Sequence, residues 1–163
     1  MRVREDRIRR RSGAEGIYGV FEKPDFVVIV PVDGDRVHLV EQFRYPVGGR
    51  YWEFPQGSWE QAPGADPQDV ARGELLEETG LAATEIAYAG HLFQGYGYAT
   101  QGYHVFVAGG LSPAVRAAQE PEEQDLVTGA VSVAELERMI RDGAVRDATT
   151  VAAFGLLRLK RLI

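Results

Sequence analysis

The sequence predicts an α+β protein built around a mixed β-sheet, and the order of its segments carries this prediction. Strand-like runs come first, one helix interrupts them, further strand-like runs follow, and two helices close the chain. Hydrophobic residues make up 45% of the 163 residues and charged residues 26%, an ordinary globular balance. This length predicts one domain over residues 1–163, large enough to bury a sizeable core.

The composition excludes several classes of function. The formal net charge is −6, so broad nucleic-acid binding is not expected, although arginines gather near the start in RVREDRIRRR. The sequence has no cysteine, which excludes disulfides, thiolate metal sites and cysteine nucleophiles and fits a reducing compartment. No apolar run reaches membrane-spanning length, and no signal segment opens the sequence. We therefore expect a cytoplasmic protein with no membrane and no nucleic-acid partner.

The first elements are expected to be strands. A basic N-terminal arm, residues 1–20, precedes a compact β-branched run from Phe26 to Val32. An Asp-Gly pair follows and leads into a second run, Arg36–Tyr45, so the two runs predict a β-hairpin. The stretch PVGGRYWEFPQG is rich in glycine and proline and predicts turns around a short strand near Tyr51–Phe54.

A helix is predicted next, from Asp66 as its N-cap to Gly80 just past its end, where a left-handed conformation is needed. Pro67 suits the first helical position. Further strands are predicted in EIAYAGHLFQ, YHVFVA and DLVTGAVSV. Ser132 begins a capping box that opens another helix, and the last helix is expected to start near Asp147.

The first predicted helix carries three glutamates on one face. Glu74 and Glu78 are four residues apart and Glu77 is three residues from Glu74, so their carboxylates lie together. Like charges at this spacing cost roughly 0.3 kcal/mol per pair, and the helix dipole disfavours anions near the C-terminal end. A divalent cation would reverse this balance, because Mg²⁺ and Mn²⁺ prefer hard oxygen ligands. Taken alone, however, the E-x-x-E-E pattern is more typical of a plain acidic surface.

The wider context changes that interpretation, because the sequence resembles the Nudix hydrolase family. The family signature is a glycine, a loop and a helix reading R-E-φ-x-E-E-x-G-φ, where φ is apolar, usually preceded by Pro-x-Gly. The matching residues are Pro55, Gln56, Gly57, Glu74, Leu75, Glu77, Glu78, Gly80 and Leu81. The segments VHLVEQFRYPVGGRYWEFPQG and MIRDGAVRDATTVAAFGLLRL also resemble ADP-ribose pyrophosphatase-like members. The resemblance implies an α/β/α sandwich with a mixed β-sheet and a catalytic loop-helix-loop.

The resemblance also implies an activity and a cofactor. Nudix enzymes cleave the pyrophosphate of a nucleoside diphosphate linked to another moiety, with Mg²⁺ or Mn²⁺ as cofactor. Carried over to this sequence, the metal ligands are Glu74 and Glu78. Glu77 and the carbonyl of Gln56 are further ligands.

A glutamate must take the proton of the attacking water, and two places in the sequence offer one. Glu77 and Glu78 lie on the signature helix. In ADP-ribose-type members the base often lies on a later loop, where QEPEEQ offers three glutamates, of which we select Glu122. A solvated acidic turn explains that loop equally well.

Substrate contacts follow from the same resemblance. Arg44 and Glu53 match positions that contact substrate in ADP-ribose-like members, and Arg44 could hold a phosphate in a bidentate manner. A strand-end salt bridge is the alternative for Arg44. Trp52, like Tyr51 and Trp59, could stack on a base, although aromatics in such segments are as often core anchors.

The identity of the substrate stays open. ADP-ribose hydrolases usually carry a proline in a loop beyond the signature, and GYGYATQGY has none. Tyr96 in this loop resembles a tyrosine of dinucleoside polyphosphate hydrolases. ADP-ribose, a nucleotide sugar and a dinucleoside polyphosphate therefore all remain candidates. ADP-ribose-like members are often homodimers through the N-terminal region, so the arm at residues 1–20 is expected to serve dimerisation.

The sequence departs from the family pattern before the first helix glutamate. Gly73 stands where the family has an arginine, Ala65 stands where a loop glutamate is expected, and the loop GSWEQAPGA is longer than usual. Restoring the arginine with Gly73→Arg is expected to keep or raise activity, unless the longer loop already fills that space. Gly73 also favours a different class of function, a non-catalytic Nudix module that binds a nucleotide or a protein, which the retained glutamates oppose.

The histidines are expected to be structural. His38, His91 and His104 are isolated in strand-like runs. No metal-ligand spacing joins them along the sequence.

Overall fold

The computed structural model of the chain describes residues 1–59, 62, 64–115 and 125–163, and it confirms the predicted α+β architecture with a mixed sheet. The strands are β1 (Arg2–Arg9), β2 (Glu15–Glu22), β3 (Phe26–Asp33), β4 (Arg36–Arg44), β5 (Gly49–Glu53), β6 (Gln56–Gly57), β7 (Leu81–Phe93), β8 (Gly102–Pro113) and β9 (Val127–Ser132). The helices are η1 (Tyr45–Val47), α1 (Pro67–Glu74), η2 (Leu75–Thr79), α2 (Val133–Asp142) and α3 (Ala148–Lys160).

The main sheet has the order β5-β4-β3-β8-β7, with β6 paired to β3 and β9 paired to β4. β3 and β8 run parallel, and the other pairs are antiparallel. β3 and β4 form the predicted hairpin, but they pair only beside their turn, at Val32 with Val37 and Asp33 with Arg36. Beyond these pairs the two strands part, so that the short strand β6 can join β3 on that side.

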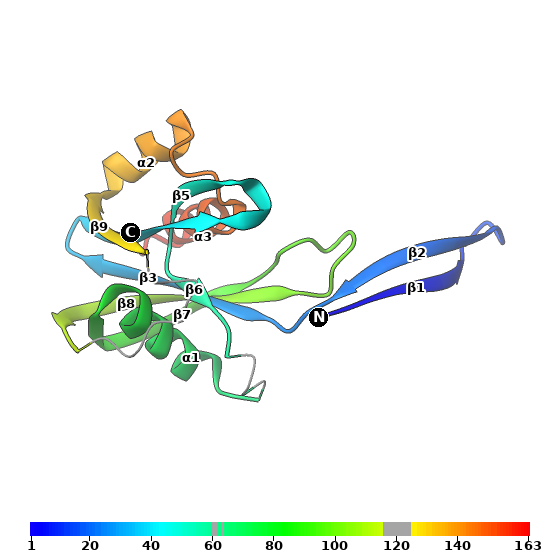
Figure 1. Ribbon diagram of the computed structural model, residues 1–163, viewed down its shortest axis with the longest axis horizontal. Helices are drawn as coiled ribbons and strands as arrows, with labels where there is room; N and C mark the ends of the chain where they lie inside the picture. The colour runs from blue at the N-terminus through cyan, green and yellow to red at the C-terminus, as the bar shows by residue number, and fades with distance from the viewer. Residues whose placement is uncertain (60–61, 63, 116–124) are drawn as a thin grey trace.

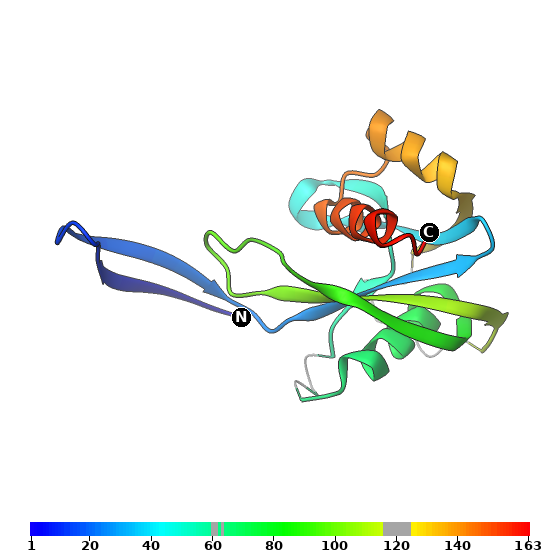
Figure 2. The ribbon, with the colours of Figure 1, turned by 180° about the vertical axis from the view of Figure 1, so that it is seen from behind.

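The central strand β3 is buried on both faces, as its compact apolar run predicts. Val28 and Val30 belong to one core cluster, together with Leu136 of α2 and residues of α3. Val27 and Ile29 belong to a second cluster, together with residues of α1. Because side chains alternate along a strand, α1 covers one face of the sheet and α2 and α3 cover the other (Figures 1 and 2). This is the predicted α/β/α sandwich.

The signature helix begins as predicted and ends differently. The Asp66 side chain caps α1 by accepting the N–H of Gln68 at 2.8 Å, and Gly80 adopts the left-handed conformation at φ 70°. Between them, however, the chain leaves the α-helix after Glu74 and makes a π-helical turn over Leu75–Thr79. Turns of this kind are rare and recur at functional sites.

The N-terminal arm forms a β-hairpin, β1 with β2, that extends away from the body (Figures 1 and 2). Its end is tied to the segment between β7 and β8, because the N–H of Phe21 donates to Tyr98 at 2.8 Å and Thr100 donates back at 2.9 Å. Val3 and Ile17 on the hairpin are 70% and 62% exposed. An isolated two-stranded hairpin is only marginally stable in water. The described residues of the body leave these two apolar side chains of the hairpin uncovered.

The described helices include none that is both long and apolar enough to cross a membrane.

Candidate active site

Two of the three signature glutamates are buried. Glu74, the last residue of α1, is 5% exposed and Glu78, in the π-helical turn, is 2% exposed, whereas Glu77 is half-buried. Burying a carboxylate is costly unless hydrogen bonds or a cation compensate it. A plain acidic surface, the alternative for the E-x-x-E-E pattern taken alone, therefore does not describe this helix face.

The backbone of β6 lies directly against these two carboxylates. The N–H of Gln56 donates to Oε2 of Glu78 at 3.0 Å. A Cβ at Gly57 would stand 2.4 Å from Oε2 of Glu74, so only glycine leaves room for that carboxylate. β6 is held in place by pairing with Val27 and Val28 of the buried strand β3. The carboxylate oxygens of Glu74 and Glu78, with the space that Gly57 leaves beside them, fit Mg²⁺ or Mn²⁺.

A cleft of about 520 Å³ adjoins the glutamates. Its lining residues come from β4, β5, η1 and the start of α3, and include Arg44, Pro46, Val47, Tyr51, Glu53, Gln56, Gln94, Arg146, Asp147, Ala148 and Thr149. Gln56 links the two regions, because its N–H meets Glu78 while its side-chain amide donates to Oδ2 of Asp147 at 3.1 Å. The volume lies within the range of ligand pockets, about 300–1,000 Å³.

Arg44 and Glu53, both predicted to bind substrate, form an ion pair in this cleft. Glu53 is 3% exposed and also accepts the amide of Gln42 at 2.8 Å. Burial raises the pKa of the Glu53 carboxyl above its ordinary value of 4.5, against the opposing effect of Arg44, and Asp147 adds to the rise. The Arg44 side chain is 41% exposed, so part of the guanidinium faces the cleft while part holds Glu53.

The start of α3 forms another wall of the cleft. The Asp147 side chain caps this helix, accepting the N–H of Thr149 at 3.2 Å and that of Thr150 at 2.8 Å. Thr150 accepts the N–H of Phe54 at 2.9 Å, which fixes the helix against the strand that carries Glu53. The sequence identifies Asp147 as a helix cap. Its place in the cleft, however, depends on its contact with Gln56, which lies 91 residues away in the sequence.

The structure does not place Trp52, a predicted substrate contact, in this cleft. Trp52 packs against the core and against Gly129 of β9, where a Cβ would stand 3.0 Å from the indole ring. It is not among the residues that line the described cleft. Because neighbours on a strand point to opposite faces, Tyr51 and Glu53 face the cleft instead. The Arg146 guanidinium lies 5.5 Å from the centre of the Tyr51 ring, in a cation–π contact.

Of the other predicted residues, Tyr96 lies away from this cleft and Glu122 is not described. Tyr96 is 86% exposed in the segment between β7 and β8, and it is not among the cleft's described lining residues. Glu122, together with Glu120 and Glu123 of the same segment, lies outside the described residues.

The structure explains why glycine replaces the family arginine at position 73. A Cβ at Gly73 would stand 2.4 Å from Cζ2 of Trp59, so the indole ring of the longer loop packs over this point of the helix. The space expected for an arginine is therefore already filled. This is the exception named for Gly73→Arg, in which the longer loop already fills the space.

We expect Gly73→Arg to lower stability only while Trp59 is present. Replacing glycine in a helix gains about 1 kcal/mol of propensity, whereas overpacking costs about 1–3 kcal/mol. Because Trp59 is 36% exposed and can yield, the net loss should be about 1 kcal/mol. In a Trp59→Ala background the arginine should be neutral or stabilising, so a double-mutant cycle measured by denaturant unfolding should give a coupling of at least about 1 kcal/mol. Additive effects would contradict the packing.

The histidines are not all isolated. The structure brings His91 and His104 together with Asp25, with one ligand atom of each residue within 4.8 Å of the others, so the prediction of isolated histidines is wrong for this pair. The pairing of β7 with β8 sets His91 opposite His104, which no local spacing in the sequence reveals.

Comparisons with known proteins agree with this geometry. The model of the NUDIX domain matches residues 22–154. A methanol dehydrogenase activator from Bacillus methanolicus is 26% identical over 164 positions, covering 100% of this chain and 88% of that protein. An ADP-ribose pyrophosphatase from Bacillus subtilis (strain 168) is 28% identical, covering 88% and 77%. The ADP compounds hydrolase NudE from Escherichia coli (strain K12) is 26% identical, covering 89% and 78%.

The fold is likewise found among solved structures. The crystal structure of an ADP compounds hydrolase matches with a TM-score of 0.84 at 24% identity, covering 96% of this chain and 83% of that one. The family match spans most of the chain and includes the buried glutamates, the close approach of Gly57 and the adjoining cleft. The chain belongs to the Nudix family of pyrophosphohydrolases.

Proposed function

We propose that this chain cleaves the pyrophosphate of a nucleoside diphosphate derivative, with ADP-ribose or a nucleotide sugar as substrate. The observation that carries the proposal is the buried pair Glu74 and Glu78 beside a cleft of about 520 Å³. Two relatives support this substrate class, because they are named ADP-ribose pyrophosphatase and ADP compounds hydrolase.

The glutamates are assigned to the metal and to the proton transfer. Glu74 and Glu78 would hold Mg²⁺ or Mn²⁺, with the half-buried Glu77 and the Gln56 carbonyl as further ligands. When bound, such an ion neutralises charge on the pyrophosphate and makes water more acidic. Glu77 and Glu78 lie on the same π-helical turn, and either could accept the proton of the attacking water. Glu122 remains our candidate for a base on the later loop.

The cleft is assigned to the substrate. Arg44 offers its exposed guanidinium edge to a phosphate or carboxylate oxygen while Glu53 fixes its position. The Tyr51 ring and the Arg146 guanidinium offer a planar surface for stacking a base or ribose. Gln94 and Asp147 line the same cleft, where the Gln94 amide can donate a hydrogen bond to a sugar hydroxyl and the Asp147 carboxylate can accept one.

The alternatives have less support. The dinucleoside polyphosphate reading depends on Tyr96, which lies outside the cleft lining. The non-catalytic module depends on Gly73, and packing of Trp59 offers another reason for that glycine.

We also propose that the chain is a homodimer through its N-terminal hairpin. Exposed Val3 and Ile17 lie on a hairpin that projects from the body, and both would gain from burial. Light scattering on the full chain should give twice 18.0 kDa, and a mass of one chain would contradict the proposal.

A panel of substrates tests the function. Turnover is measured by phosphate-coupled assay with Mg²⁺ or Mn²⁺ against ADP-ribose, ADP-glucose, GDP-mannose, a diadenosine polyphosphate, NADH and dNTPs. We expect the highest kcat/KM with ADP-ribose or a nucleotide sugar, and loss of turnover in Glu74→Gln/Glu78→Gln. Preference for the diadenosine compound would select the alternative, and nucleotide binding without any turnover would select the non-catalytic module.

A further inference from the structure

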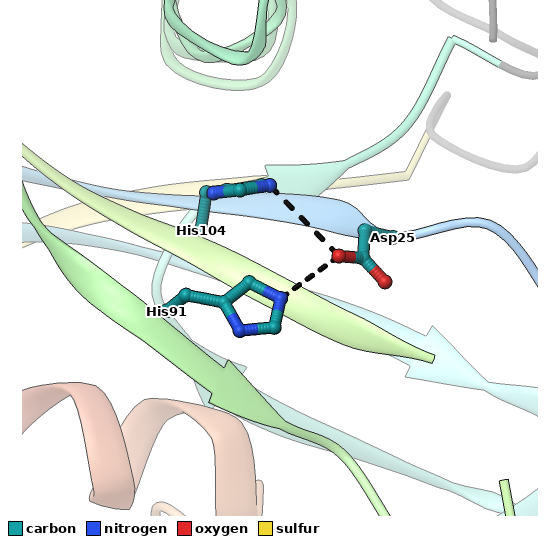
Figure 3. A group of neighbouring side chains, drawn as sticks. All are labelled: Asp25, His91 and His104. Carbon is teal, nitrogen blue, oxygen red and sulfur yellow. Dashed lines mark hydrogen bonds and ion pairs between the residues drawn. The ribbon is translucent and has the colours of Figure 1, made fainter. Parts of the chain in front are cut away.

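A second group of metal-ligating side chains lies in a row across three neighbouring strands. Asp25 immediately precedes β3, His104 lies on β8 and His91 lies on β7, and these strands are adjacent in the sheet. His91 is the register partner of His104 across the β7–β8 pair. Figure 3 shows both imidazoles turned toward the Asp25 carboxylate.

The distances suit a metal ion. Nε2 of His91 lies 2.8 Å from Oδ2 of Asp25, and Nε2 of His104 lies 3.9 Å from the same oxygen. Ligands about 2.1 Å from a tetrahedral ion stand about 3.4 Å apart, so these separations bracket the requirement. Small side-chain adjustments would bring all three atoms to one ion.

The surroundings orient the three ligands. The N–H of Gly102 donates to Oδ1 of Asp25 at 2.7 Å, which leaves Oδ2 directed at the histidines. A Cβ at Gly102 would stand 2.4 Å from Nε2 of His91, so the absence of a side chain at this glycine leaves room for the imidazole ring. Supporting hydrogen bonds of this kind are usual behind metal ligands.

The pKa values of two of these side chains, His104 and Asp25, are shifted toward the forms that bind metal. Burial and the neighbouring His91 lower the pKa of His104, which favours the neutral imidazole. Burial alone would raise the pKa of Asp25, but the Gly102 N–H and His91 outweigh it and hold that pKa below its ordinary value. Metal binding needs neutral histidine and ionised carboxylate.

We propose that Asp25, His91 and His104 form a transition-metal site that takes Zn²⁺ or a similar divalent ion, in addition to the glutamate pair. Two imidazoles and one carboxylate select such ions over Mg²⁺, which prefers oxygen ligands alone. The three side chains are 28–41% exposed, so a fourth position is open to water or to a ligand. Asp25 and His104 also line a cavity of about 160 Å³ beside Trp59, from which such a ligand could approach.

The site lies close to the candidate active site. Val27 of β3 is the register partner of Gly57 on one side and of His104 on the other. Two strand spacings, about 10 Å, therefore separate the backbone at Gly57 from that at His104. An ion here would tie the beginning of β3, where the N-terminal hairpin joins the body, to β8 and β7.

Zinc titration of the full chain tests this proposal. After metal removal, Zn²⁺ affinity is measured by competition with a chromophoric chelator, in a Glu74→Gln/Glu78→Gln background that removes the other site. We expect one Zn²⁺ per chain, and affinity at least about 100-fold weaker in His91→Ala, His104→Ala or Asp25→Ala. His38→Gln changes the third histidine of the sequence and is the matched control, which should bind normally.

A second measurement does not depend on variants that could unfold. In the unaltered chain, Zn²⁺ should shift the imidazole resonances of two of the three histidines and leave the third in place. Saturating Zn²⁺ should also raise Tm by about 5 °C. Absence of zinc binding, equal affinity in the histidine variants, or shifts at all three histidines would overturn the proposal.

Discussion

Replacing Glu78 with glutamine is expected to lower kcat about a thousandfold, within the usual range for removing a metal ligand or proton acceptor. Glu78 is 2% exposed and accepts the N–H of Gln56 at 3.0 Å. Glutamine keeps the volume and an accepting oxygen, so this hydrogen bond and the fold should survive. Turnover is measured with saturating Mg²⁺ or Mn²⁺ on the best substrate of the panel, together with Tm.

The control for this variant is Glu85→Gln, which makes the same chemical change at an exposed glutamate of β7. It should retain full activity. Unchanged kcat in Glu78→Gln, in a protein that melts normally, would refute the assignment of this residue to the metal.

Arg44→Met is expected to destabilise the protein by about 1–2 kcal/mol near neutral pH. Breaking a fully buried ion pair costs about 3–5 kcal/mol, but the Arg44 side chain is 41% exposed and solvent screens part of the interaction. Stability is lost because Glu53 stays buried while the Arg44 guanidinium, which stabilises its ionised carboxylate, is gone. Denaturant unfolding at several pH values measures it.

The pH dependence identifies Glu53 as the cause. Burial already raises the pKa of Glu53, and without Arg44 it should rise further. The folded state then keeps a proton that the unfolded state releases, so stability falls as pH rises from about 4.5 through the raised pKa. At pH values below the ordinary pKa of 4.5, the buried Glu53 should cost the variant little stability.

A double variant separates charge from packing. Arg44→Met/Glu53→Gln removes the buried charge along with the arginine, so stability should recover in part and the added pH dependence should vanish. The single variant would contradict this account if its stability relative to the unaltered chain were the same at pH 5 and pH 8. Both variants should also bind substrate less tightly, because Arg44 lines the cleft.

The sequence was informative where local rules decide the structure. The compact β-branched run predicts the strand β3, and Asp66, Pro67 and Gly80 predict the limits of the signature helix. The glutamate spacing predicts that these carboxylates act together. Resemblance to the Nudix family then supplied the chemistry that spacing alone does not.

The errors came from features that depend on distant residues. Alternation along β5 separates Tyr51 from Trp52 but does not reveal which of them faces the cleft, because β4 and β9 determine that choice. The contact of Trp59 with the helix at Gly73 is a tertiary contact that local spacing does not reveal. His91 and His104 become neighbours only through the pairing of two strands.

Mn²⁺ binding tests most directly whether Glu74 and Glu78, beside Gly57, hold the divalent ion. Mn²⁺ is titrated into the full chain in the presence of the product nucleotide AMP, with free Mn²⁺ followed by electron paramagnetic resonance. The account predicts tight Mn²⁺ binding in the unaltered chain and in His91→Ala/His104→Ala, and its loss in Glu74→Gln/Glu78→Gln. Equal Mn²⁺ affinity in the glutamate variant and the unaltered chain would contradict it.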